Sequence, residues 1–332
     1  MRRVKYGVIG LGFFGEKHLD VLSALPNVEV IGICTRRKWR LEELARKYNV
    51  PRTFTDYHEL LSDREIEAVS VVTHIETHKE PAILALNSGK HLLLEKPMAE
   101  NTADCDAIIE AARKADRLLM VGHICRFDVR YALAKERIKK GEIGKIVYLY
   151  ARRNIPASVS SSVLEKIGPI MGDGVHDTDL MLWYTNSRVK TVYATTVNVR
   201  NLKNPDIGAA LYKFEDGATG VIENVWFLPE KTPFNLDARM EIIGTKGAIY
   251  IEGPGASLAI NNETGWQQPE TVYWPRMYGW CPGALKEEIS YFINCIISGQ
   301  KPTIITPEES RAAVEVVAAA EESARTGKVI TL

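Results

Sequence analysis

The sequence predicts an α/β protein: a doubly wound parallel sheet in the first part of the chain, followed by a second part rich in antiparallel strands. Within residues 1–123, unbroken apolar runs alternate with helical stretches, as in parallel sheets covered on both faces. After residue 126, apolar and polar residues alternate instead, which is typical of antiparallel strands. A chain of 332 residues also exceeds one ordinary core. We therefore expect two domains, residues 1–123 and 124–332.

The first part reads as six strands alternating with five helices. The basic and then apolar N-terminus, MRRVKYGVIGLG, mimics a signal peptide. Glycines interrupt its apolar part and no small-residue cleavage site follows, so we interpret it as the first strand. The fourth helix should stop at Ser88-Gly89, because glycine readily ends a helix. The expected strands are 5–9, 28–34, a short one near Thr53, 68–73, 91–94 and 118–122, and the expected helices are 13–25, 39–48, 57–61, 79–87 and 103–114.

The first strand leads into GLGFFG, a GxGxxG pattern placed between a strand and a helix. Glycine at the first two positions permits a tight turn and lets the backbone approach a pyrophosphate, and the third lets helix and strand pack closely. The helix N-terminus supplies N–H groups for the anion. A glycine-rich turn without a ligand is the alternative, but this context favours a dinucleotide. The candidate residues are Gly10, Leu11, Gly12, Phe13, Phe14 and Gly15.

The end of the second expected strand indicates which dinucleotide is bound. A site for NAD places an acidic residue there, on the ribose 2′-hydroxyl. This chain has Thr35, Arg36 and Arg37 instead, and Glu29 lies at the wrong end of the strand. Arginine binds phosphate in a forked, charge-assisted geometry, which suits the 2′-phosphate of NADP, although a solvated basic helix start is the alternative. We expect NADP to be preferred, with NAD as the second option.

A charged pair ends the fifth expected strand, in the stretch HLLLEKPMA from His91 to Ala99. Ligands of a doubly wound sheet bind beyond the carboxyl ends of its strands, so the lysine of this pair is placed where a nicotinamide would lie. The proline behind it fixes the turn, for which a cis bond is one option. A surface ion pair is the alternative, but two further strand ends bring polar residues to the same edge. The candidates at this edge are Thr73, His74, Glu95, Lys96, Pro97 and His123.

The second part is expected to form a helix at each end and antiparallel strands between them. Asp216-Gly217 marks a hairpin turn. Thr306 precedes Pro307 as the N-cap of the last helix, and Gly327 ends that helix. The expected strands are 146–153, 189–200, 209–214, 220–226, 238–243 and 248–252, and the expected helices are 128–140 and 307–326.

One histidine of the second part stands between two carboxylates. Around Val175, Asp173, His176 and Asp179 follow one another at steps of three, and on a helix such residues share a face. A carboxylate orients an imidazole and raises its pKa, which suits a proton shuttle for an alcohol–ketone couple. A structural histidine and a zinc site are the alternatives. Hydride transfer requires no metal and no further ligand is evident, so no metal is expected.

Composition and charge exclude several classes of function. The 42 basic and 42 acidic side chains balance, and no basic block indicates a nucleic-acid or membrane-surface partner. No apolar run approaches the roughly 20 residues of a membrane span. The five cysteines form no CxxC pair and no metal-ligand spacing, which suits a reducing cytoplasm.

Several stretches together resemble the Gfo/Idh/MocA family of NAD(P)-dependent oxidoreductases: GLGFFG, THIETH ending at His78, GKHLLLEKPMA, GHICRF and EEISYFINCIISGQKP. The resemblance covers essentially the whole chain. It implies a Rossmann domain followed by an α/β domain with a large, open, mostly antiparallel sheet. It further implies oxidation or reduction of sugars, sugar derivatives or cyclitols at a secondary carbon, and we place His78 with the cofactor residues.

The resemblance also implies catalytic roles. Lys96 contacts the nicotinamide ribose and polarises the substrate oxygen, and His176 is the general acid/base. The acid that usually stands four residues before this histidine is Gly172 here. Asp173 is expected to cover its role, since positions three and four before a residue share a helix face. Substrate contacts are expected from Lys96, Arg126, Arg153, Asp173, His176 and Tyr278.

Two other functions stay open at this point. One is a dinucleotide-binding sensor without catalysis, against which the retention of Lys96 and His176 argues, because a sensor needs no proton relay. The other is an NAD-dependent glycoside hydrolase of the same fold that oxidises the sugar only transiently. Fold-level analogy adds an expected homodimer or homotetramer, because an exposed sheet face favours pairing of subunits.

Overall fold

The structure is a computed structural model and describes residues 2–253, 258–263 and 265–332. Contacts divide the chain into two compact units. The first contains Met1–Phe127 and Val272–Arg311, and the second contains Asp128–Thr271 and Ala312–Leu332. The chain leaves the first unit close to the expected domain boundary and then returns to it. Residues 272–311, which we expected in the second domain, thus group with the first unit.

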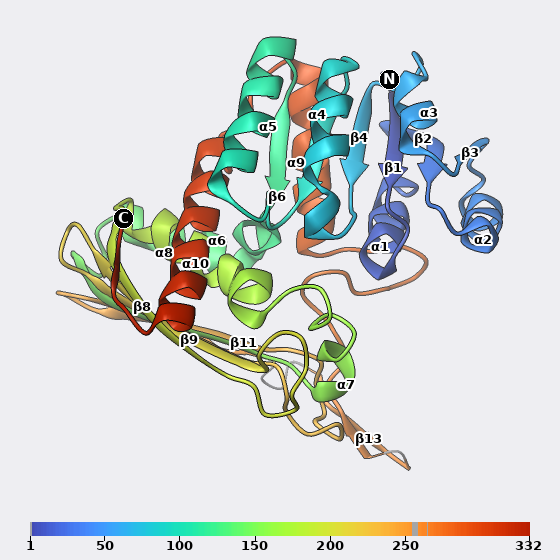
Figure 1. Ribbon diagram of the computed structural model, residues 1–332. Coiled ribbons are helices and arrows are strands. Elements are labelled where there is room, and N and C mark those ends of the chain that lie inside the picture. Colours follow the sequence, from blue (N-terminus) through green and yellow to red (C-terminus); the bar gives the residue numbers. More distant parts are fainter. Residues whose placement is uncertain (1, 254–257, 264) are drawn as a thin grey trace. The chain divides into compact units, whose positions relative to one another are not determined.

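The first unit is built on a six-stranded parallel sheet with the order β3-β2-β1-β4-β5-β6, which confirms the doubly wound prediction. Its strands are apolar runs because helices cover both faces: α3, α4 and α5 pack in a row, and α1 packs against α9. Figure 1 shows α4 and α5 on one side of the sheet and α9 on the other. The elements are β1 (Val4–Ile9), α1 (Phe13–Leu22), β2 (Val28–Cys34), α2 (Lys38–Tyr48), β3 (Arg52–Phe54), α3 (Tyr57–Ser62), β4 (Ala68–Val71), η1 (Ile75–Thr77), α4 (Lys79–Asn87), β5 (His91–Glu95), α5 (Thr102–Ala115), β6 (Leu119–Gly122), η2 (Ile124–Phe127) and α9 (Ala284–Ser298).

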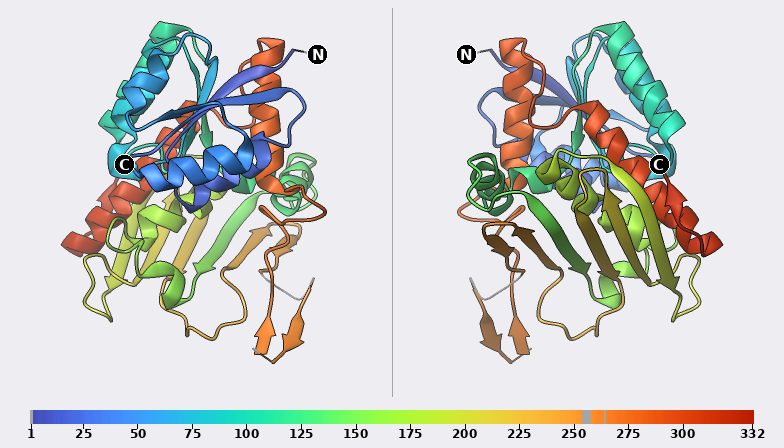
Figure 2. Two further views of the ribbon diagram at one scale, coloured as in Figure 1. Left: turned by 90° about the vertical axis from the view of Figure 1, so that its right-hand side faces the viewer. Right: turned by 90° about the vertical axis from the view of Figure 1, so that its left-hand side faces the viewer.

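The second unit is built on a seven-stranded sheet with the order β12-β11-β7-β10-β9-β8-β15. Only β7 and β10 pair in parallel among the described pairs, so the sheet is mostly antiparallel, as predicted. Helix α8 packs on β7 and β10, and a separate hairpin, β13–β14, extends from this unit in both views of Figure 2. The elements are α6 (Val129–Lys139), β7 (Ile146–Asn154), α7 (Ala157–Ser160), the π-helical turn η3 (Ile170–Gly174), α8 (Val175–Thr185), β8 (Val189–Val197), β9 (Ile207–Phe214), β10 (Thr219–Val225), β11 (Asp237–Gly244), β12 (Ala248–Ile251), β13 (Ile260–Asn262), β14 (Gly265–Gln267) and β15 (Ile330–Thr331), and α10 (Pro307–Thr326) crosses from the first unit into the second.

Local chemistry explains where elements end. Helix α1 stops before residue 25 because the Leu25 N–H bonds to the Leu22 carbonyl at 3.3 Å, an i→i−3 contact that tightens the chain ahead of a proline. Strand β8 stops before residue 200 because the N–H groups of Val199 and Arg200 turn to the carboxylate of Asp206, at 2.7 and 2.9 Å. Neither partner is evident from local sequence alone.

Two predicted turns and caps are confirmed. Gly217 has a φ of 97° in the β9–β10 hairpin, which is the left-handed conformation that a tight turn requires. Thr306 and Glu309 form a capping box at the start of α10, with the Thr306 N–H 2.9 Å from the Glu309 carboxylate. In the part of the chain that the structure covers, no helix is long and apolar enough to cross a membrane.

Candidate functional site

The glycine turn between β1 and α1 gives each glycine a different task. Gly10 has a φ of 93°, and a Cβ there would stand 2.4 Å from the Val72 carbonyl oxygen. A Cβ on Gly15 would stand 1.9 Å from the Gly10 carbonyl oxygen, so the approach of α1 to the turn requires glycine. At Gly12, the N-cap of α1, no described atom lies within 4 Å of an added Cβ. Open space therefore meets the helix N-terminus, as a pyrophosphate site requires.

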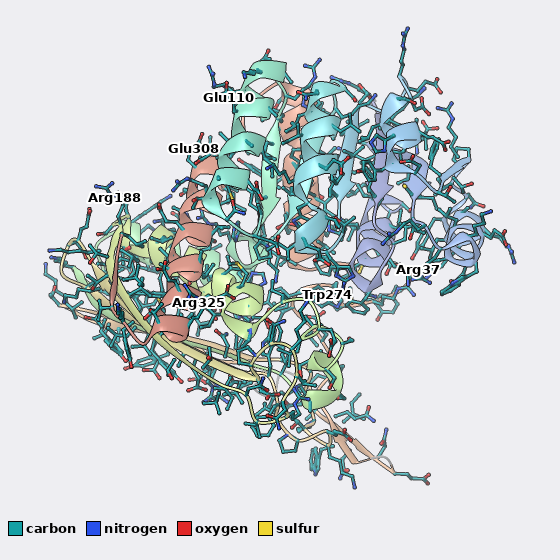
Figure 3. All side chains as sticks on the ribbon, in the orientation of Figure 1. Arg37, Glu110, Arg188, Trp274, Glu308 and Arg325 are labelled. Carbon is teal, nitrogen blue, oxygen red and sulfur yellow. The ribbon has the colours of Figure 1, made fainter. Side chains whose placement is uncertain are left out.

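Arginines hold this turn from the side of α2. Arg37 Nη2 donates to the Leu11 carbonyl at 2.9 Å, and Arg40 Nε lies 3.4 Å from the same oxygen. Arg40 and Lys47 also pair with Glu16 in the first turn of α1. Burial raises the pKa of Glu16, but hydrogen bonds from Lys47 and Arg40 and their charges outweigh it and lower the pKa to about 2. Figure 3 labels Arg37, one of the two arginines expected to bind a 2′-phosphate, and the backbone of the turn already engages it.

The end of β2 carries Thr35, which is half-buried, and Arg36, which is exposed. Acidic residues outside β2 also act electrostatically on the end of this strand. Burial, together with the charges of Asp56 and Glu59, raises the pKa of the Cys34 thiol to about 12. Asp56 is the N-cap of α3, so sequence analysis of β2 alone missed it.

Strand β5 ends at Glu95, and Lys96 follows at the carboxyl edge of the sheet. Lys96 is half-buried, and its backbone N–H lies 3.3 Å from Glu95 Oε2. The Lys96–Pro97 peptide bond is cis. The edge predicted for Lys96 is thus the edge at which the glycine turn lies, because β1 and β5 belong to one parallel sheet.

The His78 side chain connects the backbones of two loops at this edge. It is buried, with Nδ1 2.9 Å from the Pro97 carbonyl and Nε2 3.0 Å from the Thr73 carbonyl. Burial lowers its pKa, against the opposing effect of these two carbonyls. Its place is therefore behind the loop backbone, whereas His74 is exposed and Thr73 is half-buried.

The aromatic loop of residues 272–283 lies against the glycine turn. The ring of Trp274, which is labelled in Figure 3, meets the rings of Phe13 and Phe14 edge-on, at centroid distances of 6.2 and 5.3 Å. Phe13 is 67 % exposed, so it is no core residue. Tyr278, expected to contact substrate, stands at the loop tip with 92 % of its surface exposed and a φ of 50°. No local pattern in the sequence indicates that this loop belongs beside α1.

In the second unit, His176 opens α8 and is buried, and Asp173 lies half-buried in η3. At Gly172, where the resemblance leads one to expect an acid, a Cβ would stand 2.5 Å from Cη2 of Trp226. A Cβ on Gly174 would stand 2.8 Å from Asn224 Oδ1. Trp226 therefore occupies the space that a side chain at position 172 would need, and the role of Asp173 stays a prediction.

The two arginines expected to contact substrate are buried and have partners within their own units. Arg126 donates to the Ile304 carbonyl at 2.7 Å and pairs with Glu309 at 3.2 Å. Arg153 pairs with Asp177, the neighbour of His176, at 2.9 Å. The Arg126 contacts connect η2 to residues 304 and 309, and the Arg153 pair connects β7 to α8.

The described residues differ in how well they suit a metal ion and a dinucleotide. No group of three or more His, Cys, Asp or Glu side chains in residues 2–253, 258–263 and 265–332 is arranged to hold a metal ion. The open space at Gly12 and the helix N-terminus beside it do fit a dinucleotide pyrophosphate.

Several known proteins and protein families are similar in sequence to this chain. Residues 4–123 match the profile described as "Oxidoreductase family, NAD-binding Rossmann fold", and residues 131–250 match that of the "GFO/IDH/MocA C-terminal domain". Myo-inositol 2-dehydrogenase of Thermotoga maritima is 29 % identical over 327 residues, covering 96 % of this chain and 96 % of the relative. Scyllo-inositol 2-dehydrogenase (NAD(+)) of Bacillus subtilis is 29 % identical over 353 residues, covering 99 % and 96 %.

A solved structure extends the similarity to the whole fold. The crystal structure of a probable dehydrogenase from Thermotoga maritima matches with a TM-score of 0.83 at 27 % identity, covering 99 % of this chain and 98 % of the other. The profiles span both units, and the relatives align over nearly their entire length. The chain therefore belongs to the Gfo/Idh/MocA family of oxidoreductases, with an NAD(P)-binding Rossmann domain at its N-terminus.

Proposed function

We propose that the protein transfers a hydride between the nicotinamide of NAD(P) and a secondary carbinol or ketone of a sugar, sugar derivative or cyclitol. The observation that carries this proposal is the position of Lys96. Strand β5 delivers it to the edge of the sheet at which the glycine turn leaves room for a pyrophosphate. The names of the two relatives, both inositol 2-dehydrogenases, favour a cyclitol as substrate.

In this mechanism the chain supplies polarisation and proton transfer. Lys96 polarises the substrate oxygen, and His176 takes the hydroxyl proton during oxidation and returns it during reduction. Asp173 orients the imidazole, and Tyr278 offers an exposed substrate contact, with Arg126 and Arg153 contributing from buried positions. A nicotinamide bound at this site would accept or supply the hydride.

The test combines binding with turnover. The protein is titrated with NADPH and NADH by fluorescence, and then assayed with myo-inositol, scyllo-inositol and a panel of sugars. Lys96→Ala should lower kcat about a hundredfold or more, because it removes a preorganised charge from the reacting oxygen, and should largely keep cofactor affinity. Lys114→Ala, on the exposed end of α5, is the matched control. Near-normal turnover of Lys96→Ala would contradict the proposal.

We also propose that NADP is preferred over NAD, because Arg36 is exposed at the end of β2 and no acid follows that strand directly. The name of the Bacillus subtilis relative specifies NAD(+) for that protein. Arg36→Ala should weaken NADPH binding about tenfold, the effect of one charge-assisted hydrogen bond, and leave NADH binding unchanged. Arg46→Ala, exposed in α2, controls for general charge. Equal affinities of the wild type for both cofactors would contradict this preference.

A homodimer or homotetramer is proposed to form through the open face of the second sheet. Tyr193 and Leu211 are neighbours on adjacent strands of this face, each 47 % exposed, and Tyr250 is 62 % exposed. Light scattering after size-exclusion chromatography should give a mass above one subunit, and Leu211→Glu should lower it. A monomer in both cases would contradict the proposal.

The five free, buried cysteines fit the proposed cytoplasmic location.

A further inference from the structure

Behind Lys96, four polar side chains form a hydrogen-bonded row inside the first unit. We call this row the His18 chain. Tyr6 Oη lies 3.0 Å from Ser70 Oγ, Ser70 Oγ lies 3.1 Å from His18 Nδ1, and His18 Nε2 lies 3.0 Å from Glu95 Oε1. All four residues are buried, and they come from β1, β4, α1 and β5. The row therefore crosses the unit and ends at the residue before Lys96.

One order of protons satisfies all three contacts of the His18 chain. In this order His18 donates from Nε2 to the Glu95 carboxylate, and its Nδ1 accepts the Ser70 hydroxyl proton. Ser70 in turn accepts from Tyr6, whose pKa burial raises, so the phenol keeps its proton. Each of the three contacts then has one donor and one acceptor.

The strand next to β5 leaves room for this carboxylate. Gly122 of β6 is the sheet partner of Glu95, and a Cβ on it would stand 2.8 Å from Glu95 Oε1. The carboxylate therefore lies in a fitted space between Gly122 and His18, and its second oxygen accepts from the backbone of Lys96.

A second buried carboxyl group comes from α9, the helix that returns to the first unit and packs on α1 and β1. Glu288 is fully buried, and among the described residues neither of its oxygens has a hydrogen-bond partner. Burial first, and the charge of Glu95 second, raise its pKa well above the ordinary value of 4.5. Glu288 interacts electrostatically with Glu95 on β5 and with Tyr6 on β1, and His18 of α1 bonds to Glu95. Two buried like charges would repel each other, so the fold favours the neutral form of Glu288.

We propose that His18 is a positioning residue for Lys96 and that Glu288 is a buried neutral acid. His18 fixes the side chain of Glu95 behind Lys96 through the Nε2 contact, and a neutral Glu288 adds no buried negative charge beside it. The inference rests on the proposed role of Lys96 in hydride transfer. A shift of a catalytic group by about 1 Å can lower a rate about a hundredfold, so the anchoring of Glu95 should affect kcat more than cofactor binding.

Three substitutions of His18 separate its two hydrogen bonds. Glutamine can still donate to Glu95, asparagine reaches only toward Ser70, and leucine makes neither contact. We expect kcat to fall in the order Gln, Asn, Leu, with His18→Leu about tenfold to a hundredfold below the wild type and NADPH affinity unchanged. Wild-type kcat for His18→Leu, with Lys96→Ala inactive, would overturn the proposal. Wild-type kcat in both variants would instead overturn the role of Lys96.

The proton order can be read without turnover or a folded leucine variant. In ¹⁵N spectra of the imidazoles, the His18 signals are assigned by their absence from His18→Gln. We expect a proton on Nε2 in the wild type. An Nε2 without a proton at neutral pH would overturn the proposed anchoring of Glu95, whatever the substrate of the protein is.

Glu288→Gln tests the neutral acid. A carboxyl whose pKa is raised by folding stabilises the protein fully below the unfolded value near 4.5, and that contribution is lost as pH rises toward the folded value. Glutamine does not titrate, so the Tm of Glu288→Gln should rise relative to that of the wild type as pH increases from 5 to 8. Glu287→Gln, the exposed neighbour, should show no such trend. Parallel Tm curves for Glu288→Gln and the wild type would overturn this part of the inference.

Discussion

Two glycine-bearing turns precede the two helices that carry the proposed site, and they use glycine for opposite purposes. Before α1, Gly12 leaves space that no described atom fills. Before α8, the missing side chains of Gly172 and Gly174 make room for Trp226 and Asn224. In the first turn, glycine leaves the backbone open, and in the second it lets side chains from β10 and the residue after it approach the backbone. A glycine in a turn before a helix therefore does not by itself indicate a ligand.

The two turns are also held in place by different interactions. The glycine turn before α1 is fixed by backbone geometry and by the arginine contacts to Leu11. The helix of His176 is fixed by close packing of η3 on the strand that ends at Val225 and on Trp226 beyond it. Substitutions of single glycines should therefore have effects that differ in size and in what they disturb.

The largest effect is expected for Gly15→Ala. The added Cβ would stand 1.9 Å from the Gly10 carbonyl oxygen, so α1 and the turn must separate. We expect the free energy of unfolding to fall by about 3 kcal/mol, as measured by urea titration, with loss of NADPH binding. An unfolding curve like that of the wild type would show that α1 can move away from the turn, and it would contradict the expected clash.

A smaller effect is expected for Gly172→Ala, because the contact is with a side chain rather than the backbone. The free energy of unfolding should fall by about 2 kcal/mol, since the Cβ meets the six-membered ring of Trp226. Trp226→Leu removes that ring. The double variant should lose less than the sum of the two single losses, by about 1 kcal/mol. Strict additivity in urea titrations of the four proteins would disprove the contact.

The smallest effect on stability is expected for Gly12→Ala. The position has space for a Cβ and a negative φ of −75°, so the unfolding free energy should fall by only about 0.5 kcal/mol. NADPH affinity should fall severalfold, because the methyl group occupies the space assigned to the pyrophosphate. If the affinity were unchanged, the anion would have to bind elsewhere on α1.

Much of the fold was predictable because its signals are local. Strand β2 and helices α4 and α10 begin and end at the expected residues, where apolar runs, glycine stops and an N-cap mark the boundaries. The return of α9 to the first unit was not predictable, because its partners α1 and β1 are far away in the sequence. The short strands β13, β14 and β15 were missed as well, since two- and three-residue strands with exposed side chains carry no periodic signal.

The candidate site was likewise predictable only in part. The tasks of Gly10 and Gly15 followed from the spacing of GLGFFG, and the place of Lys96 followed from the end of an apolar run. The contact of Arg37 with Leu11, the effect of the Asp56 charge on the Cys34 pKa and the packing of Trp274 on α1 required the three-dimensional structure. In each of these cases the partners come from different elements, so no spacing within one element encodes them.

The return of α9 has a consequence for the order of events during synthesis. The ribosome releases the six strands of the first sheet early, but it must make all of the second unit up to Thr271 before α9 exists. Until then, the surface that Ile289, Phe292 and Ile293 later cover is exposed to solvent. A nascent chain with a completed sheet and an uncovered apolar face is open to chaperones and to aggregation. The first unit therefore starts folding first but can finish only near the end of translation.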